Sequence, residues 1–415
     1  MRILAGKAAE ARVRELEQRG ATDLGRVEKQ VARIVNDVRK KGDKALRKYA
    51  EKWDGLKRNQ SLRISSSEMD QAWHSVSEDF KRALDVAATN IRRYCEWQKP
   101  QPWTKATGHG IEVGQVVRPL RSAGCYVPGG RYPLPSTMLM TVIPAQVAGV
   151  NNIRVVSPRP AVETLATARF LGITEFYRVG GAQAVAALAY GTKSIPAVDK
   201  IVGPGNLFVT AAKKMVAFDC GIDFLAGPTE VAIVSEDGDP RFIAADLVAQ
   251  SEHDPDALAV FITATKALAE KVLQETKKAA ADNKIASTSL KNNGIALLAG
   301  SHDQAIEFAN RIAAEHITVS QDDVAKIECA GSIFVGDYSP QAAGDYASGP
   351  NHVLPTGATA RFRGGLSVQD FVKIISVQHL SRSGLNQIAA SVIMLAEAEG
   401  LLAHAESIRV RNSHA

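Results

Sequence analysis

The stretch that decides the fold is residues 153–216, which read IRVVSPRPAVETLATARFLGITEFYRVGGAQAVAALAYGTKSIPAVDKIVGPGNLFVTAAKKMV. Three short apolar runs in it have the length and β-branched content of buried strands, and each precedes an alanine-rich helical stretch. The strands are expected at 153–158, 175–179 and 198–202, and the helices at 162–171, 182–190 and up to Val216. Strands that alternate with helices across tight glycine turns predict a parallel sheet covered by helices.

The same alternation continues downstream and predicts a second parallel sheet. Further strands are expected at 230–235, 259–263, 294–298 and 332–335, separated by helices at 239–252, 267–278 and 303–314. The first hundred residues have helical spacing, with a helix at 25–53 and N-cap serines at 65–67 and 77. Residues 366–411 have an apolar stripe (Leu385, Ile388, Val392, Leu395 and Leu402) and are expected to be nearly all helix. The fold class is therefore α/β with two Rossmann-like domains.

Composition excludes several classes of protein. The chain has 415 residues, of which 45% are hydrophobic and 23% charged, so it is not a disordered polypeptide. Its net charge of +6 is spread along the chain, without the basic blocks that follow a nucleic-acid backbone. The longest uncharged stretch, residues 132–153, is too polar and too rich in proline for a membrane span, and we expect no signal peptide. The four cysteines are scattered, which favours a cytoplasmic location.

Two glycine turns predict a site for an anionic ligand such as a pyrophosphate. Gly180-Gly181 and Gly203-Pro204-Gly205 each connect a strand to a helix and place backbone N–H groups at the start of that helix. Neither turn is a full GxGxxG, and short connections of this kind need glycine whatever they bind. Gln183 and Asn206, early in the two helices, favour a nucleotide. Tyr126, in the segment Tyr126–Arg131, either contacts a cofactor ring or is a core aromatic.

Candidate chemical groups follow later in the chain. Gln250 and His253 lie three residues apart near the end of a predicted helix, so they share a face. Imidazole is a common zinc ligand, but a histidine at this position more often compensates the helix dipole. Glu315-His316 places a carboxylate beside a group that titrates near neutrality, but as a dipeptide alone it is usually a surface pair.

Four further candidate residues lie nearer the C-terminus, and one cysteine is a candidate nucleophile. Asp345 and His352 fall in a long non-periodic segment, which suggests function. Glu399 and His404 stand in the helical tail, where a solvent-facing acid and a capping histidine are the alternative. Cys125 is a weak candidate nucleophile, because no histidine accompanies it in sequence.

In this order and at roughly this spacing, the segments resemble the histidinol dehydrogenase family over essentially the whole chain. The resemblance is carried by Tyr126-Val127-Pro128-Gly129-Gly130, Gly180-Gly181-Ala182-Gln183-Ala184, the segment 198–206, Ala226-Gly227-Pro228-Thr229-Glu230, the segment 250–253, Glu315-His316, the segment 344–356 and Gly365-Leu366-Ser367-Val368. It implies an aldehyde-dehydrogenase-like arrangement of an N-terminal arm (1–22), a first α/β domain (23–118 with 230–365), a nucleotide-binding domain (119–229) and a dimer-swapped tail (366–415).

The resemblance also implies an activity and its groups. L-Histidinol would be oxidised through L-histidinaldehyde to L-histidine in two NAD-dependent steps, the last of histidine biosynthesis, with His316 as general base and Glu315 activating water. One Zn²⁺ per subunit would anchor the substrate through Gln250, His253, Asp345 and His404. NAD would contact Tyr126, Gln183 and Asn206. The substrate would be surrounded by Thr229, Gln250, His253, His316, Asp345, His352, Glu399 and His404. The family is a homodimer with shared active sites, to which Glu399 and His404 would contribute across the interface.

Two departures from the family pattern leave a second substrate open. Thr229 replaces the usual serine, and Ala314 replaces the usual proline before the catalytic glutamate. The alternative is a paralogous zinc- and NAD-dependent dehydrogenase of another small alcohol, such as a sulfopropanediol. Two other classes remain as competing hypotheses: a non-catalytic module that binds a nucleotide or anion, and a scaffold that dimerises through its C-terminal helix.

Overall fold

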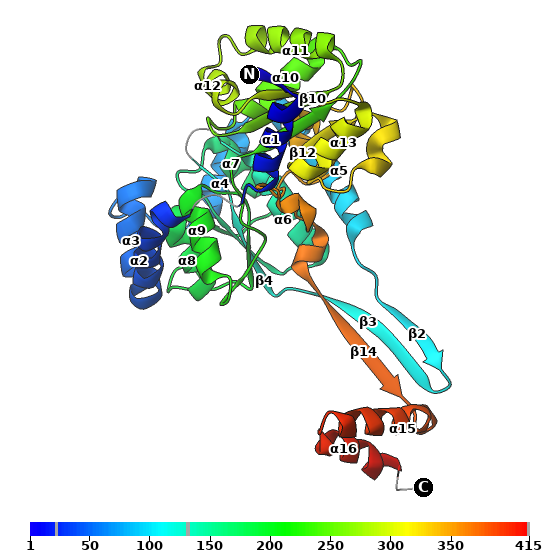
Figure 1. The fold of residues 1–415 in the computed structure, drawn as a ribbon. Helices are drawn as coiled ribbons and strands as arrows, with labels where there is room; N and C mark the ends of the chain where they lie inside the picture. The colour runs from blue at the N-terminus through cyan, green and yellow to red at the C-terminus, as the bar shows by residue number, and fades with distance from the viewer. Residues whose placement is uncertain (21–23, 130–132, 413–415) are drawn as a thin grey trace. The chain divides into compact units, whose positions relative to one another are not determined.

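The computed structural model describes residues 1–20, 24–129 and 133–412 (Figure 1). It divides into two compact units, which are described separately. The first unit comprises Met1–Gln98 with Leu120–Phe371, and the second comprises Lys99–Pro119 with Val372–Ala415. No helix in the described part of the chain is long and apolar enough to cross a membrane.

A six-stranded parallel sheet forms one half of the first unit. Its order is β1 (Arg2–Ala5), β11 (Ile295–Leu298), β10 (Leu258–Thr263), β9 (Glu230–Val234), β12 (His316–Val319) and β13 (Ser332–Val335). Successive side chains of a strand point to opposite faces. Accordingly, Ala232 and Val234 join one apolar cluster, while Val231 and Ile233 join another.

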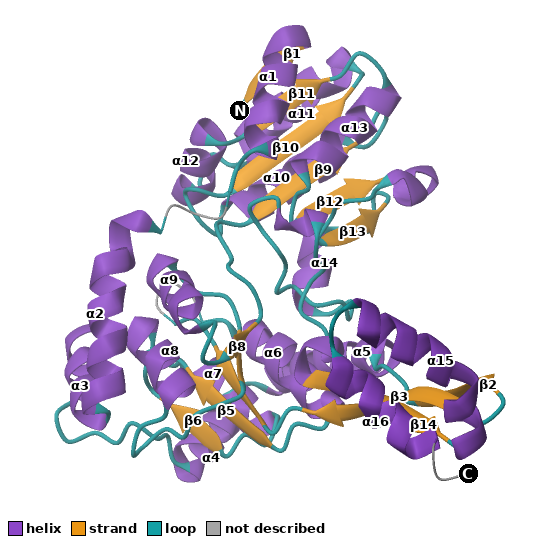
Figure 2. Cartoon of the chain, turned by 60° about the horizontal axis from the view of Figure 1, so that its bottom comes forward, coloured by secondary structure: helices purple, strands orange, loops and turns teal. Residues whose placement is uncertain are grey.

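Helices cover both faces of this sheet (Figure 2). The cluster of Ala232 includes residues of α1 (Gly6–Glu17) and α13 (His302–Ile312). The cluster of Val231 includes residues of α10 (Pro240–Ser251), α11 (Lys266–Ala279) and α12 (Lys284–Asn292). A parallel sheet with both faces covered needs strands that are apolar throughout, and β9 and β10 are buried along their whole length.

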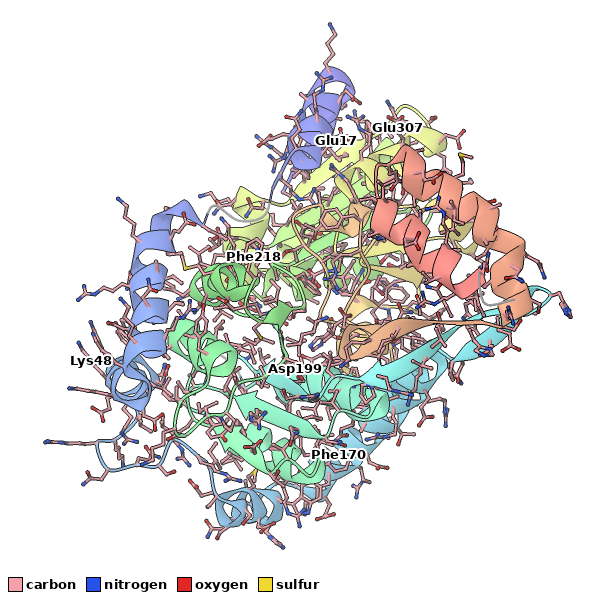
Figure 3. All side chains as sticks on the ribbon, turned by 90° about the horizontal axis from the view of Figure 1, so that it is seen from below. Glu17, Lys48, Phe170, Asp199, Phe218 and Glu307 are labelled. Carbon is pink, nitrogen blue, oxygen red and sulfur yellow. The ribbon has the colours of Figure 1, made fainter. Side chains whose placement is uncertain are left out.

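The other half of the first unit is a five-stranded parallel sheet. Its order is β6 (Glu175–Tyr177), β5 (Asn152–Val156), β4 (Ser122–Tyr126), β7 (Lys200–Val202) and β8 (Gly221–Ile222). Its associated helices are α6 (Pro135–Ala148), α7 (Val162–Phe170), α8 (Gly181–Tyr190) and α9 (Leu207–Val216). The Asp199 carboxylate accepts hydrogen bonds from the backbone N–H groups of Arg121 and Ser122, both at 2.9 Å, and so fixes the start of β4 (Figure 3).

The N-terminal helices lie against the five-stranded half, which differs from our expectation that residues 23–118 join the six-stranded half. Helix α2 (Gly25–Lys41) shares an apolar cluster with α8 and α9, and α4 (Ser66–Ser75) and α5 (Glu78–Gln98) pack on α7 and α6. Gly42, at φ +53°, divides the helix expected at 25–53 into α2 and α3 (Asp43–Tyr49), followed by a π-helical turn, Ala50–Asp54. The expected N-cap at Ser65 is confirmed as a capping box with Glu68.

Residues 1–22 were expected to form an arm, but their described part is built into the six-stranded half. Strand β1 pairs with β11 along its whole length, and α1 packs on α13. Arg311 of α13 forms ion pairs with Glu10 and Glu17 of α1 at 2.7 and 3.1 Å, and with Glu307 at 3.3 Å. Figure 3 labels two of these partners, Glu17 and Glu307. A four-residue strand next to a helix has too short a periodic pattern to be recognised in a sequence.

The second unit contains an antiparallel sheet of β14 (Val372–Leu380), β3 (Ile111–Pro119) and β2 (Trp103–Gly108), followed by α15 (Arg382–Ala398) and α16 (Leu402–Asn412). The expectation of a tail that is nearly all helix is therefore wrong for residues 372–380. Their sequence, VKIISVQHL, is rich in β-branched residues and favours a strand. The helical C-terminal end is confirmed, as is the α/β class with two parallel sheets. The aldehyde-dehydrogenase-like arrangement stays a prediction.

Candidate active site

A cavity of about 570 Å³ in the first unit collects most of the residues singled out in the sequence. Its wall includes turns after β4 and β7 of the five-stranded sheet, and the starts of β9 and β12 of the six-stranded sheet. The predicted residues that line it are Asn206, Thr229, Gln250, His253, Glu315, His316, Asp345 and His352. Segments as far apart in the chain as Pro128 and Thr356 thus meet at one site.

Glu315 and His316 are buried members of this group, next to and at the start of β12. Strand β12 was missed in the sequence because it follows α13 after only three residues, Ala313–Glu315, with Ala313 in the left-handed region at φ +49°. Parallel pairing of β12 with β9 places His316 opposite Val231. The backbone of Glu230 is consequently adjacent to both side chains: its N–H donates to Glu315 Oε2 at 2.9 Å, and its carbonyl accepts from His316 Nδ1 at 3.0 Å.

These contacts set the protonation state of the pair. Because His316 Nδ1 carries the proton that the Glu230 carbonyl accepts, a neutral His316 has its lone pair on Nε2. Nε2 is buried and has no hydrogen-bond partner among the described residues; its nearest carboxylate oxygen, Asp345 Oδ1, is 3.6 Å away, beyond hydrogen-bond distance. In the neutral ring, this atom is a base to which no described protein group donates a proton.

Burial and mutual charge shift both pKa values. Burial raises the pKa of the Glu315 carboxyl to about 7, although His316, Thr229 and the Glu230 N–H act in the opposite direction. Burial alone would lower the pKa of His316, but the nearby Glu315 and Asp345 outweigh it and raise this pKa to about 9. A carboxyl that titrates near neutrality in a cavity is typical of acid–base catalysis.

Thr229 and Gln250 extend the network from Glu315 toward the cavity. The Thr229 hydroxyl donates to Glu315 Oε2 at 2.5 Å and accepts a hydrogen bond from the Gln250 amide. Thr229 therefore performs the hydrogen bonding that a serine would perform, and its additional methyl leaves the network intact. Gln250 is the penultimate residue of α10 and is 3% exposed, so its amide is fixed rather than solvated.

Asp345 and His352 are joined by the chain between them. Asp345 lies in α14 (Gln341–Tyr346), so the segment expected as one long loop begins with a helix. The His352 Nδ1–H donates to the Asp345 carbonyl at 2.7 Å, and His352 Nε2 is 3.4 Å from Thr137 Oγ1. Burial raises the pKa of Asp345, but the neighbouring His316 outweighs it and the net shift is downward, which keeps the carboxylate charged.

The zinc hypothesis fits the donors of the first unit. Gln250, His253 and Asp345 line the same cavity, and an imidazole and a carboxylate are ordinary zinc ligands. Among the described residues, no group of three His, Cys, Asp or Glu side chains is placed to hold a metal ion. The expected set supplies only two such side chains from the first unit, because Gln250 is an amide. His404 lies in α16 and Glu399 follows α15, both in the second unit, so their roles remain predictions.

The turn after β7 lines the cavity, and the buried side chains of Asp223 and Lys213 hold its backbone at Gly203. Pro204, Gly205 and Asn206 line the cavity, and the Asn206 side chain caps α9 by accepting from the N–H groups of Phe208 and Val209. The buried Asp223 carboxylate accepts from the Gly203 N–H at 2.7 Å. The buried Lys213 ammonium donates to the Gly203 carbonyl at 2.5 Å and to Asp223 at 2.6 Å. Sequence reasoning missed this ion pair, because nothing in the spacing shows that Lys213 points inward.

The turn after β6 has a different arrangement from the expected free anion site. The Gly180 N–H donates to the Asp54 carboxylate at 3.0 Å, and the Gly181 N–H donates to the Tyr126 hydroxyl at 2.9 Å. Gln183 is 2% exposed and also donates to Asp54, at 3.0 Å. Protein groups therefore occupy these amides, and Tyr126 and Gln183 shape the turn. Gly130 and Arg131, quoted with Tyr126 in the sequence, lie outside the described residues.

Cys125 is excluded as a nucleophile by its surroundings. It is fully buried within β4, and burial raises the pKa of its thiol to about 12. A thiol with that pKa is not a thiolate at neutral pH.

Comparisons with known proteins identify the family of the chain. The model of the histidinol dehydrogenase family matches residues 17–412. Histidinol dehydrogenase of Geobacter metallireducens is 44% identical over 95% of this chain and 93% of its own length, and that of Methanothermobacter thermautotrophicus is 45% identical over 96% and 97%. The crystal structure of histidinol dehydrogenase from Elizabethkingia anophelis superimposes with a TM-score of 0.95 at 34% identity, covering 100% of this chain and 98% of that one. The chain belongs to the histidinol dehydrogenase family and is an oxidoreductase of histidine biosynthesis.

Proposed function

We propose that this enzyme oxidises L-histidinol to L-histidine through L-histidinaldehyde, in two successive NAD-dependent steps, with one Zn²⁺ anchoring the substrate. The observation that carries the proposal is the buried Nε2 of His316, for which the described part of the chain offers no hydrogen-bond partner and which belongs to a residue that lines the cavity. An alcohol placed beside this atom can transfer its hydroxyl proton to it as the carbon is oxidised.

His316 acts as general base in both steps. The Glu230 carbonyl holds its Nδ1 proton, so the ring cannot rotate or change tautomer without losing a buried hydrogen bond. Because its pKa is raised to about 9, His316 must first release its Nε2 proton to solvent; Nε2 then accepts the proton of the alcohol in the first step and, after a second release, that of the aldehyde hydrate. The Asp345 carboxylate, 3.6 Å from Nε2, stabilises the imidazolium that each transfer creates.

Glu315 activates the water that adds to the aldehyde. Its carboxylate takes a proton from water as the oxygen attacks the aldehyde carbon, and a pKa near 7 allows it to release that proton again at neutral pH. The hydrogen bonds from Thr229 and from the Glu230 N–H fix one carboxylate oxygen, Oε2.

Different residues would hold the two cofactors. Gln250, His253, Asp345 and His404 would hold the metal ion, which when bound supplies a Lewis-acidic anchor for the imidazole and amino nitrogens of the substrate. NAD, which accepts the electrons in each step, would lie along the turn of Gly205 and Asn206, with Tyr126 and Gln183 supporting the neighbouring turn.

We further propose a cytoplasmic homodimer with shared active sites. Met394, Leu395 and Leu402 of the second unit are each 65% exposed, and an apolar surface of this kind favours a partner chain. In the dimer, Glu399 and His404 would complete the site of the other subunit.

The decisive experiment measures NADH formed per L-histidinol consumed by the purified enzyme, together with its zinc content. The proposal expects a ratio of two. A ratio of one, or turnover only with an unrelated alcohol such as a sulfopropanediol, would contradict it and favour the paralogous activity.

A variant separates the two steps. Glu315→Gln should slow oxidation of the aldehyde far more than oxidation of the alcohol, because only the aldehyde needs water. Asp246→Asn is the matched control: burial raises the pKa of this carboxyl to about 6, but Asp246 is not among the residues lining the cavity. If Glu315→Gln and Asp246→Asn lost the same fraction of the aldehyde oxidation rate, the role of Glu315 would be contradicted.

A further inference from the structure

Behind the Glu315–His316 pair lies an ion pair to which neither the family pattern nor the proposed function assigns a role. Arg19, in the segment after α1, donates from Nε and Nη2 to the two carboxylate oxygens of Glu230, at 2.9 and 2.7 Å. The Arg19 side chain is 17% exposed and that of Glu230 only 6%. Such a two-pronged contact fixes both side chains in one geometry, which a single ammonium contact does not do.

Glu230 is the residue whose backbone holds the catalytic pair. Its N–H donates to Glu315 and its carbonyl accepts from His316, so a small rotation of this one residue moves both contacts. Its side chain is held in turn by Arg19 and by the Gly357 N–H, which donates to Oε1 at 3.0 Å.

Arg19 also binds the segment that leads into the pair. Its Nη1 donates to the Ile312 carbonyl at 2.7 Å, at the end of α13 and three residues before Glu315. The same guanidinium therefore contacts both chain segments that carry the site, β9 through Glu230 and the α13–β12 connection through Ile312. Arg19 itself is not among the described residues that line the cavity.

We propose that Arg19 is a positioning residue for catalysis: through Glu230 it holds Glu315 and His316 in their reactive geometry. This inference rests on the proposed function. It predicts that loosening the Arg19–Glu230 contact lowers kcat for both the alcohol and the aldehyde, because the two catalytic side chains are held by the same residue. Substrate and NAD binding, which use other residues, stay nearly unchanged.

Arg311 provides a matched control. It has a similar side-chain exposure, 20%, and its ion pairs with Glu10 and Glu17 likewise join α1 to α13, but no contact with Glu230 is found among the described residues. Loss of either arginine weakens the same helix packing. Only loss of Arg19 also removes the contact to Glu230, the residue whose backbone holds Glu315 and His316.

The test compares Arg19→Lys and Arg19→Ala with Arg311→Lys and Arg311→Ala. Lysine keeps the positive charge but cannot donate to both oxygens of Glu230 at once. Arg19→Lys should therefore fold even if Arg19→Ala does not, because alanine leaves a buried carboxylate unpaired. We expect kcat to fall about tenfold or more in Arg19→Lys for L-histidinol and for L-histidinaldehyde, with KM values within about twofold. Both Arg311 variants should keep kcat within about twofold while losing thermal stability comparably. Zinc content and NAD affinity should match the wild type in all four.

Three outcomes would overturn the inference. The first is an equal kcat for the Arg19 and Arg311 variants. The second is a change in KM without a change in kcat. In either case the wild type still oxidises L-histidinol, so the proposed function stands and only the role of Arg19 fails. The third is a wild-type enzyme without activity on L-histidinol, which removes the proposed function and this inference together.

Discussion

Replacing Lys213 with methionine should destabilise the enzyme strongly and weaken NAD binding. The side chains of Lys213 and Asp223 are 4% and 1% exposed, and their ion pair is 2.6 Å long. Methionine has nearly the same length, so the variant removes the charge rather than the packing. Asp223 would keep its hydrogen bonds from Gly203 and Phe224, both at 2.7 Å, but it would be a buried carboxylate without a cation.

The expected magnitude follows from that burial. Breaking a buried pair by removing one partner costs about 3–5 kcal/mol. The Gly203 carbonyl also loses its donor, which loosens the turn before Asn206, and we expect the dissociation constant for NAD to rise about tenfold, or about 1.4 kcal/mol. Lys200→Met is the control. Lys200, in β7, pairs with Asp370 at 3.0 Å and 16% exposure, so its loss should cost about 1 kcal/mol and leave NAD affinity unchanged.

The assay is urea unfolding followed by circular dichroism, with NAD affinity measured by titration. A double-mutant cycle adding Asp223→Asn tests the reasoning directly, and its coupling energy should be about 2–3 kcal/mol. Additive effects, or equal midpoints for Lys213→Met and Lys200→Met, would refute the argument that a buried ion pair clamps this turn.

Three other predictions follow from contacts described above or from one further cluster. Asp54→Asn should raise KM for NAD about tenfold with kcat little changed, because Asp54 holds Gly180 and Gln183; an unchanged KM in steady-state assays would contradict this. Thr229→Ser should keep kcat and Thr229→Val should lower it, since only serine can still donate to Glu315; equal kcat values would show that the hydroxyl is dispensable. His302 lies next to Asp323, which raises its pKa above 6.5, so its stabilising contribution is complete below pH 6.5 and is lost as the pH rises through the raised value. Wild type should therefore exceed His302→Gln in unfolding midpoint by more at about pH 6 than at about pH 9, and a pH-independent difference would exclude this linkage.

Much of the fold was predictable because both parallel sheets have strong apolar runs. Strands such as β5 and β10 and helices such as α8 and α13 are where their periodicity places them. The errors have common physical causes. Strands β1 and β12 have four residues each, too few for a recognisable pattern. The apolar stripe of α15, when continued toward the N-terminus, predicts helix where the chain forms strand β14. The packing of α2 on α8 and α9 depends on tertiary contacts, which no local pattern contains.

For the site, the residue types were predictable and their supports were not. The sequence alone left Glu315-His316 as an uninformative dipeptide, and only the resemblance gave it a role. The contacts that give the pair its chemistry come from Glu230, 85 residues from Glu315, and from Arg19, 211 residues from Glu230. At the Gly180-Gly181 turn, the glycine pattern predicts backbone amides that are free to bind a phosphate. In the structure these two amides donate to Asp54 and Tyr126 instead.

The attachment of His316 to a β-strand affects how a reaction in two stages can proceed. Strand β12 is hydrogen-bonded on both sides, to β9 and to β13, so the imidazole shares the stiffness of the sheet. In the proposed sequence, spent NADH leaves and fresh NAD enters while the aldehyde waits. That exchange cannot be driven by swinging the base aside. NADH and NAD would instead exchange past Gly205 and Asn206, which line the same cavity and of which Asn206 is exposed.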